Sequence, residues 1–417
     1  MSFSTYFRML PLLSISLLLA AGCATPIPPS YSMSGQQPDL PGPIAALAAG
    51  DGQVAAANPD GVFLKAEGKG WERLEIPGLK DPGKVTCLAF QENSLFVGTD
   101  GEGLHILSDG QWEVVSRKYS GLPGDGVLSL AVDGKDDDFP GTSLWVGTRD
   151  GFAVLREGTW IMYSPEEKWL DSLSGENMAE DEAEVYLGLG YDLVRGSRMA
   201  DLFTPPVTAV AVGPDRVVFA NNKSRLAVVG GGSVAVVHFY DDRAVRSIVV
   251  DENVIWAGTD RGLLWGGVSG KAAGRPWPTN YPQAQWGGSL SGTRDTRPFE
   301  YRWFQVGYST ANVSDLVRDG TALWVAHTGG SGPGLDTVPA GGTRRGADLT
   351  DPIIDLRRYL NIGEYIVRRE KPVFESYGMD DGLKGDTLAV APVPERREVW
   401  VGTERGLYRF QRPGQRP

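Results

Sequence analysis

The sequence has few of the side chains that form metal sites and disulfide networks, with 2 cysteines and 3 histidines in 417 residues. Two thiols can form at most one intramolecular disulfide, which excludes a scaffold held together by several cross-links. The motifs G-x-S-x-G and H-E-x-x-H do not occur, so the chain carries no signature of a serine hydrolase or a zinc protease. Packing must therefore supply the stability of the fold.

Positive charge is also scarce. The chain has 40 Lys and Arg against 52 Asp and Glu, a formal net charge of -12, and no run of more than two basic residues. Such a surface repels phosphate backbones, which excludes a nucleic acid as the partner.

A single long apolar run occurs, and it lies near the N-terminus. Met9 to Ala21 follows a short segment with one basic residue and is shorter than the roughly 20 apolar residues that span a bilayer. This pattern predicts a signal peptide over residues 1–22. The segment from Leu19 to Cys23 resembles a bacterial lipobox, which implies that Cys23 becomes the acylated, palmitate-bearing mature N-terminus. Ordinary secretion, with cleavage after a small residue, is the alternative.

The lipobox resemblance also implies a location and a membrane partner. The chain would sit in the cell envelope, held on the membrane by its N-terminal lipid. Ala24 rather than Asp after Cys23 implies release to the periplasmic face of the outer membrane, if the organism is Gram-negative. Residues 23–43 are rich in proline, serine and glutamine, which predicts a lipid anchor followed by a tether.

What the chain has in abundance is turn residues and repeats, with 55 Gly and 28 Pro beside 41% hydrophobic residues. A strand-like phrase of the form V-x-x-L-A-V recurs seven times. It begins at Ile44, Val85, Val127, Val207, Val245, Val313 and Thr387. The shorter spacings between copies, 41, 42 and 38 residues, match the length of a propeller blade.

A second phrase, close to L-W-V-G-T, follows each copy of the first and is clearest at Leu95–Thr99, Leu144–Thr148, Ile255–Thr259 and Val399–Thr403. A glycine turn, a third strand and an aromatic fourth strand come next. Four strands in about 40 residues make one blade, so the sequence predicts an all-β, seven-bladed propeller over residues 44–417. We expect the Trp or Phe of the second phrase to face the next blade, where a small residue two places later lets the sheets approach.

The last repeat ends after its third strand, at Phe410, so its blade is one strand short. A connector at Asp39–Gly42 implies a strand just upstream, near Ser30 to Ser34. We predict that this N-terminal strand completes the last blade and pairs the two exposed edges of the ring. A plain linker in this segment is the alternative.

With these phrases in view, residues 44–410 resemble two-component regulator propeller repeats, whose units combine V-x-x-I-A-x-D, L-W-V-G-T-x-x-G-L, an aromatic strand and D-G-L. In that family the propellers are often the periplasmic sensor halves of hybrid histidine kinases, and many serve polysaccharide detection. This chain shows no kinase domain. The resemblance therefore implies the fold, and signalling by phosphotransfer is not expected.

Three insertions depart from the repeat, at residues 164–206, 265–302 and 328–371. The second holds Trp277, Tyr281 and Trp286, whose faces suit stacking on sugars or anchoring a protein partner. The alternative is a loop whose aromatic side chains cover a mouth of the propeller.

A group of turn residues forms a second candidate binding site. If the turns after the second strands share one mouth, then Arg149, Arg261 and Arg405 surround it, with His327 where other repeats have Thr. The alternative is that these side chains are merely solvated.

No cofactor and no metal are expected. The loop with Asp133, Asp136 and Asp138 is the one weak calcium candidate, because its spacing is not that of an EF-hand. No pair of carboxylates stands out as catalytic.

Together these features predict a non-catalytic, lipid-anchored propeller of the cell envelope that binds a polysaccharide, peptide or envelope protein. The alternatives are a propeller enzyme acting on a glycan or lactone, and a structural scaffold of an envelope complex.

Overall fold

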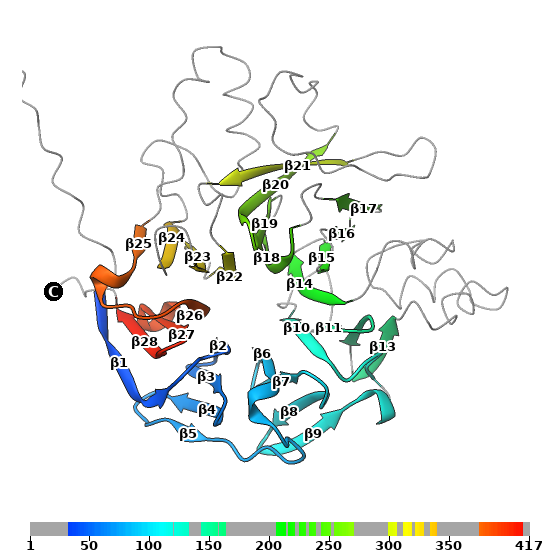
Figure 1. Ribbon diagram of the computed structural model, residues 1–417. Coiled ribbons are helices and arrows are strands. Elements are labelled where there is room, and N and C mark those ends of the chain that lie inside the picture. The colour runs from blue at the N-terminus through cyan, green and yellow to red at the C-terminus, as the bar shows by residue number, and fades with distance from the viewer. Residues whose placement is uncertain are drawn as a thin grey trace, which may run out of the picture.

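Seven four-stranded antiparallel sheets are arranged as blades around a central axis (Figure 1). The computed structural model describes residues 32–119, 121–132, 143–156, 158–163, 206–213, 216–221, 225–230, 233–238, 243–251, 254–270, 299–306, 312–318, 322–328, 334–339 and 375–411. The predicted all-β, seven-bladed propeller is confirmed. Within the described residues, no helix is both long and apolar enough to cross a membrane.

The blades are numbered along the chain. In blades 1 to 6 the strands run outward from the axis in sequence order, and in blade 7 the outermost strand is β1. Blade 1 contains β2 (Ala46–Gly50), β3 (Gln53–Asn58), β4 (Gly61–Ala66) and β5 (Glu72–Arg73). Blade 2 contains β6 (Val85–Gln91), β7 (Ser94–Thr99), β8 (Leu104–Ser108) and β9 (Gln111–Val115). Blade 3 contains β10 (Val127–Val132), β11 (Ser143–Thr148), β12 (Phe152–Arg156) and β13 (Thr159–Tyr163).

Blade 4 contains β14 (Val207–Gly213), β15 (Arg216–Asn221), β16 (Arg225–Gly230) and β17 (Ser233–His238). Blade 5 contains β18 (Val245–Asp251), β19 (Val254–Thr259), β20 (Gly262–Gly270) and β21 (Phe299–Val306). Blade 6 contains β22 (Asn312–Arg318), β23 (Ala322–Thr328), β24 (Gly334–Pro339) and β25 (Glu375–Tyr377). Blade 7 contains β26 (Thr387–Val393), β27 (Glu398–Thr403), β28 (Gly406–Gln411) and β1 (Ser32–Pro41). The 3-10 helices within the described residues are η1 (Pro82–Lys84), η2 (Arg117–Tyr119), η5 (Met379–Asp381) and η6 (Pro394–Arg396).

The ring has two faces, which carry different turns. On the first, the turns between second and third strands lie beside the connectors that enter each blade: the Arg149 amide donates to the Gly126 carbonyl, and the Asp260 amide to that of Ala244. We call this the connector face. The opposite face carries the turns between first and second strands, such as Pro394–Arg397, and those between third and fourth strands. We call it the tether face, because β1 begins there.

The glycine of the L-W-V-G-T phrase explains how closely the blades approach. A Cβ atom built on Gly98 would lie 2.7 Å from a methyl carbon of Val127, the first residue of the next inner strand. Gly402 faces Ile44 in the same way, at 2.8 Å, where blade 7 meets blade 1. The first residue of a V-x-x-L-A-V phrase therefore fills the space that the glycine of the preceding blade leaves free, as predicted.

The threonine of the same phrase has a local structural role. The hydroxyl groups of Thr99, Thr148, Thr259 and Thr403 are buried, and each donates to the carbonyl of the glycine that ends its turn, at 2.7 to 3.1 Å. The T-x-x-G motif thus closes a turn on the connector face and leaves its hydroxyl group inaccessible to a ligand.

Aromatic side chains fill the space between neighbouring blades. Trp145 of blade 3 lies 5.7 Å from Phe219 of blade 4, measured between ring centroids, and Trp400 of blade 7 lies 5.5 Å from Trp71 of blade 1. The second-strand aromatics are buried, as expected for core residues: Phe96, Trp145, Phe219, Trp256, Trp324 and Trp400. Edge-on contacts of this kind add to the apolar area that each junction buries.

The ring is closed by the two ends of the chain. Strand β1 pairs with β28, from Ser32 opposite Gln411 to Pro41 opposite Gly406, and supplies the fourth strand of blade 7 (Figure 1). The predicted closing strand is confirmed, and it extends further than Ser34. The sequence predicted a lipid anchor and tether over residues 23–43. The structure shows that residues 32–41 of this range belong to the propeller.

Two insertions are also shorter than the sequence suggested. Strand β20 continues to Gly270 and β21 begins at Phe299, so both ends of the range 265–302 are strand. Strand β24 lies inside the range 328–371. The repeat did not reveal these strands, because the end of β20 and most of β24 contain Gly, Ser, Asp or Thr where other blades have apolar residues. The insertion 164–206 lies outside the described residues except for its last one.

Overpacking the closing junction should destabilise the ring. We expect Gly402→Val to lower the free energy of unfolding by about 1–3 kcal/mol, because the new methyl groups collide with Ile44. Gly70→Val is the matched control, since Gly70 is exposed and nothing lies within 4 Å of its Cβ position. Urea denaturation of both variants tests this, and equal stabilities would contradict the assigned role of the glycine.

Removing apolar contact from the closing strand should have a similar effect. Leu40 is fully buried and packs with Ile44 and Leu407. We expect Leu40→Ala to lower the free energy of unfolding by about 2–5 kcal/mol. Ser32→Ala, at the exposed start of the same strand, should change it by less than about 0.5 kcal/mol. A Leu40→Ala variant as stable as Ser32→Ala would show that β1 does not hold the ring closed.

Candidate functional site

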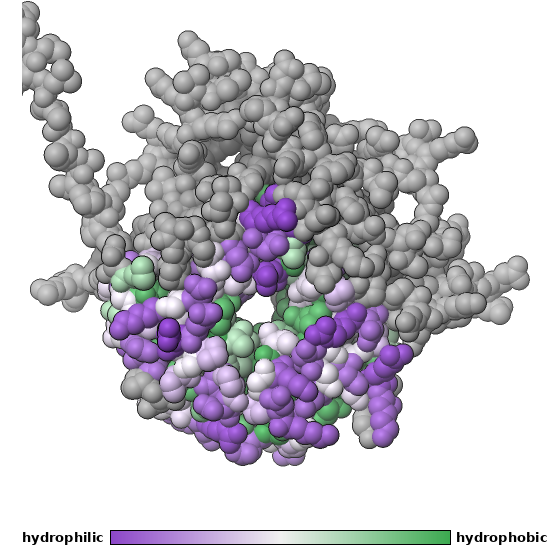
Figure 2. Space-filling view, viewed as in Figure 1, coloured by the Kyte–Doolittle hydropathy of each residue, from purple (hydrophilic) through white to green (hydrophobic). Residues whose placement is uncertain are grey.

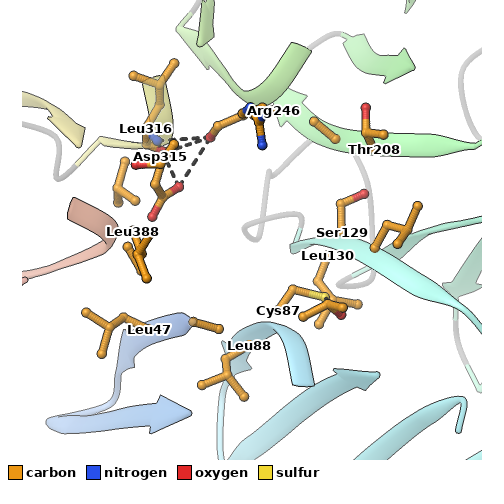
Figure 3. A pocket seen from close by; sticks show the side chains of 18 of the residues that line it. Leu47, Cys87, Leu88, Ser129, Leu130, Thr208, Arg246, Asp315, Leu316 and Leu388 are labelled. Atoms are coloured by element: carbon orange, nitrogen blue, oxygen red, sulfur yellow. Dashed lines mark hydrogen bonds between the residues drawn. The ribbon is translucent and has the colours of Figure 1, made fainter. Parts of the chain in front are cut away.

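A cavity of about 280 Å³ lies on the axis of the ring. All seven inner strands, or the residues beside them, line the cavity (Figure 3). Figure 2 shows the opening at the centre of the ring. The lining residues lie near the beginning of the inner strands. Each inner strand starts at the connector face, so the cavity occupies the half of the channel next to that face.

The lining comes from the two variable positions of the V-x-x-L-A-V phrase and the apolar residue after them. The first variable position holds Ala45, Thr86, Leu128, Thr208, Arg246, Ser314 and Leu388. The second holds Ala46, Cys87, Ser129, Ala209, Ser247, Asp315 and Ala389. Small residues predominate, which keeps the channel open, and one residue in each set is charged.

In blades 2, 4 and 6, a hydroxyl group at the first variable position links the blade to the next one. Thr86 donates to the carbonyl of Val127 at 2.7 Å, Thr208 to that of Val245 at 2.9 Å, and Ser314 to that of Thr387 at 2.6 Å. Each bond joins one inner strand to the next around the ring. These hydroxyl groups donate their protons to backbone carbonyls. We therefore assign them a structural role and not a role in ligand binding.

Arg246 is the one cation that lines the described part of the cavity. Its side chain is exposed and lies at the cavity in Figure 3. Among the described residues, no hydrogen bond or ion pair engages its guanidinium group. This group offers five donors in a planar fork, which matches a carboxylate, sulfate or phosphate.

Asp315 is the one carboxylate of the lining, and it joins three blades. Its oxygens accept hydrogen bonds from Ser247 of blade 5 at 3.3 Å and from its neighbour Leu316 at 2.8 Å (Figure 3). They also accept a hydrogen bond from the amide of Val390 in blade 7 at 3.0 Å. Burial raises the pKa of Asp315 to about 6, although these three donors act in the opposite direction. The carboxylate therefore links the blades at an electrostatic cost.

Cys87 lines the same cavity and is the free thiol of the described residues. Burial raises its pKa to about 12, although Thr86 and the Gly98 backbone favour the thiolate. A thiol with so high a pKa is a poor nucleophile at neutral pH.

The three arginines predicted to surround a mouth all lie in turns of the connector face. Arg149 forms an ion pair with Asp100 of the preceding blade, in which two nitrogen-oxygen distances are 2.6 Å, and this bond lowers the pKa of Asp100. The amides of Arg261 and Arg405 donate to the threonine hydroxyl groups of their turns. All three side chains are exposed, and none lines the cavity.

His327 does not extend this ring of exposed charges. It is 8% exposed within β23, where it occupies the threonine position of the repeat, and burial lowers its pKa. Its carbonyl accepts a hydrogen bond from Thr387 of blade 7 at 2.8 Å. The structure thus makes His327 part of the junction between blades 6 and 7.

Other predicted residues lie outside the described part of the chain: Trp277, Tyr281, Trp286, Cys23, Asp133, Asp136 and Asp138. Within the described part, no group of three or more His, Cys, Asp or Glu side chains is placed to hold a metal ion.

Arg246 and Asp315 were not predicted from the sequence as site residues. Both occupy positions that the repeat leaves variable, and they are the only charged residues among the seven copies of those two positions. An alignment of the seven repeats, searched for residues that differ in charge from the other copies, would have identified both.

No family model and no curated protein matches the chain. Among solved structures, it is similar to the extracellular domain of the putative hybrid two-component system BT4673 from B. thetaiotaomicron, with 10% identity and a TM-score of 0.50. That match covers 91% of this chain, which spans only 40% of the BT4673 domain.

Two further matches are propellers. The Cps50 (Swd1) β-propeller domain from Myceliophteria thermophila is 11% identical, with a TM-score of 0.51 and coverage of 92% of this chain and 100% of that one. The WD40 β-propeller domain of Doa1 is 13% identical, with a TM-score of 0.51 and coverage of 92% and 96%. At these identities the comparisons show the propeller fold and nothing about activity.

The raised pKa of Asp315 predicts a pH dependence of stability. The folded state holds the proton more tightly than the unfolded chain, so stability contributed by this group is present at low pH and is lost as the pH rises toward about 6. We therefore compare the free energy of unfolding of Asp315→Asn with that of the parent chain. We expect this difference to favour the variant more at about pH 7.5 than at about pH 4.5.

Urea denaturation at both pH values measures this difference. Asp100→Asn is the control, because the pKa of Asp100 is lowered and its contribution has the opposite sign. A pH-independent effect of Asp315→Asn would show that the carboxyl group titrates normally.

Proposed function

We propose that this chain is a lipoprotein of the bacterial cell envelope, acylated at Cys23, which binds its partner without chemical turnover. The lipobox at its N-terminus supports the acylation. The propeller supports the binding role, because its loops and central channel present side chains from distant parts of the chain on one rigid frame. The resemblance to two-component regulator repeats supports a place among sensory or adaptor propellers, and fold alone carries this analogy.

The observation that carries the proposal is the cavity on the axis, which contains an arginine, Arg246, that no described residue pairs with. A guanidinium group beside apolar and small residues favours a ligand that presents one anionic group. The cavity, about 280 Å³, is slightly below the range of about 300–1,000 Å³ that holds drug-sized molecules. It therefore suits the end of an acidic polysaccharide, or one acidic side chain of a peptide or protein, inserted from the connector face.

The aromatic group Trp277, Tyr281 and Trp286 remains a predicted second contact for the same partner. Stacking on these rings would supply apolar area that the cavity lacks. Arg149, Arg261 and Arg405 lie on the connector face, which is the face at which the partner would arrive.

Removing the cation should weaken binding of acidic ligands. On arrays of carboxylate-bearing oligosaccharides and acidic peptides, we expect Arg246→Ala to reduce affinity by about 10- to 100-fold, which corresponds to one charge-assisted hydrogen bond. Neutral ligands should be unaffected. Arg246→Lys should retain part of the affinity.

Arg117→Ala is the matched control, since it removes an equal charge from an exposed position outside the cavity. If both alanine variants lose affinity equally, the effect comes from net charge and the cavity is not the site. If neither loses affinity, binding resides in the loops instead.

A further inference from the structure

We infer that the lipid anchor holds the tether face of the propeller toward the membrane and turns the connector face, with the mouth of the cavity, away from it. The inference rests on the proposed acylation of Cys23. It defines the surface at which a partner docks, and that partner approaches from the aqueous side of the anchoring leaflet.

The first step is the fixed point at which the chain leaves the ring. Ser32 lies opposite Gln411 at the tether face, and β1 then runs along β28 to the connector face. Its path is held by side chains as well as by the ladder: the Arg409 side chain donates to the Ser34 hydroxyl at 2.9 Å, and Gln36 donates to the Arg405 carbonyl at 3.2 Å. Everything upstream of Ser32 therefore starts from the tether face.

The second step is the reach of the linker. Only residues 24–31 separate Cys23 from Ser32, and nine residues of fully extended chain span at most about 32 Å. Strand β1 has 10 residues and, at about 3.3 Å per residue, is itself about 33 Å long. To bring the connector face to the bilayer, the linker would have to run back along the whole of β1. Its entire length would be used before the turns of that face could approach the lipid.

The third step is the position of the cavity. Arg246 is the second residue of its V-x-x-L-A-V phrase. The other lining residues lie mainly at the second to fourth positions of the same phrase in the other blades. The cavity thus lies in the half of the channel next to the connector face. A partner that inserts an acidic group must therefore reach the ring on the side opposite to the one where the chain leaves it.

The orientation can be measured on the acylated full chain in vesicles of phosphatidylethanolamine and phosphatidylglycerol that contain acceptor-labelled lipid headgroups. Single cysteines for a donor dye are placed in exposed turns of two blades. On the tether face these are Glu67→Cys and Glu395→Cys; on the connector face they are Asp60→Cys and Glu404→Cys. Cys87 reacts slowly with a thiol-directed dye, because it is only partly exposed and burial raises its pKa to about 12.

We expect energy transfer to the headgroups to be at least twofold greater from both tether-face positions than from their partners in the same blades. Insertion of a long Gly-Ser segment before Ser32 should abolish the difference, because the ring can then turn over. Equal transfer from the two faces of the unmodified protein, or greater transfer from the connector face, would overturn the inference.

A separate measurement distinguishes this failure from that of the proposed function. Metabolic labelling with a palmitate analogue, compared with Cys23→Ser, reports the acylation itself. If the label is absent from the parent chain, the proposed lipid anchor and the inferred orientation are both wrong. If the label is present and the connector face lies nearer the lipid, only the orientation is wrong.

Discussion

The contact between the first residue of a V-x-x-L-A-V phrase and the glycine of the preceding blade is the constraint on which the ring depends. Val127 against Gly98 and Ile44 against Gly402 are two instances of the same contact at different places in the circle. Because this contact sets the distance between neighbouring sheets, it also sets the width of the channel. The cavity at the axis is therefore a product of the same packing that stabilises the fold.

The sequence was sufficient to predict the architecture, because two phrases recur with the spacing of a blade and end in glycine turns. It also predicted the closing strand, since a missing fourth strand at the end and a connector near the start imply each other. It placed the boundaries of the insertions poorly. Strands β20 and β24 contain glycine, serine or threonine where other blades have apolar residues, so periodicity did not reveal them.

The candidate site was harder to predict than the fold. Residues that line a propeller channel come from seven separate strands. Arg246 and Asp315 lie in different blades, so no short sequence motif contains both. The arginines of the turns, by contrast, attracted interest because they stand in a conspicuous motif, yet Arg149 is engaged by Asp100 and the motif threonines close turns. In repeat proteins, recurrence marks what the fold requires, and departures from it mark what an individual chain has acquired.

The pairing of β1 with β28 joins residues about 375 positions apart, as the contact between Ser34 and Arg409 illustrates. During synthesis, β1 is the first strand of the propeller to be made, and its partner β28 is the last. The ring can therefore close only after β28 has been made, and the edge of β1 stays unpaired until then. Contacts of such long range slow folding, and unpaired strands invite aggregation. This topology therefore makes blade 7 the last blade to gain all of its strand partners.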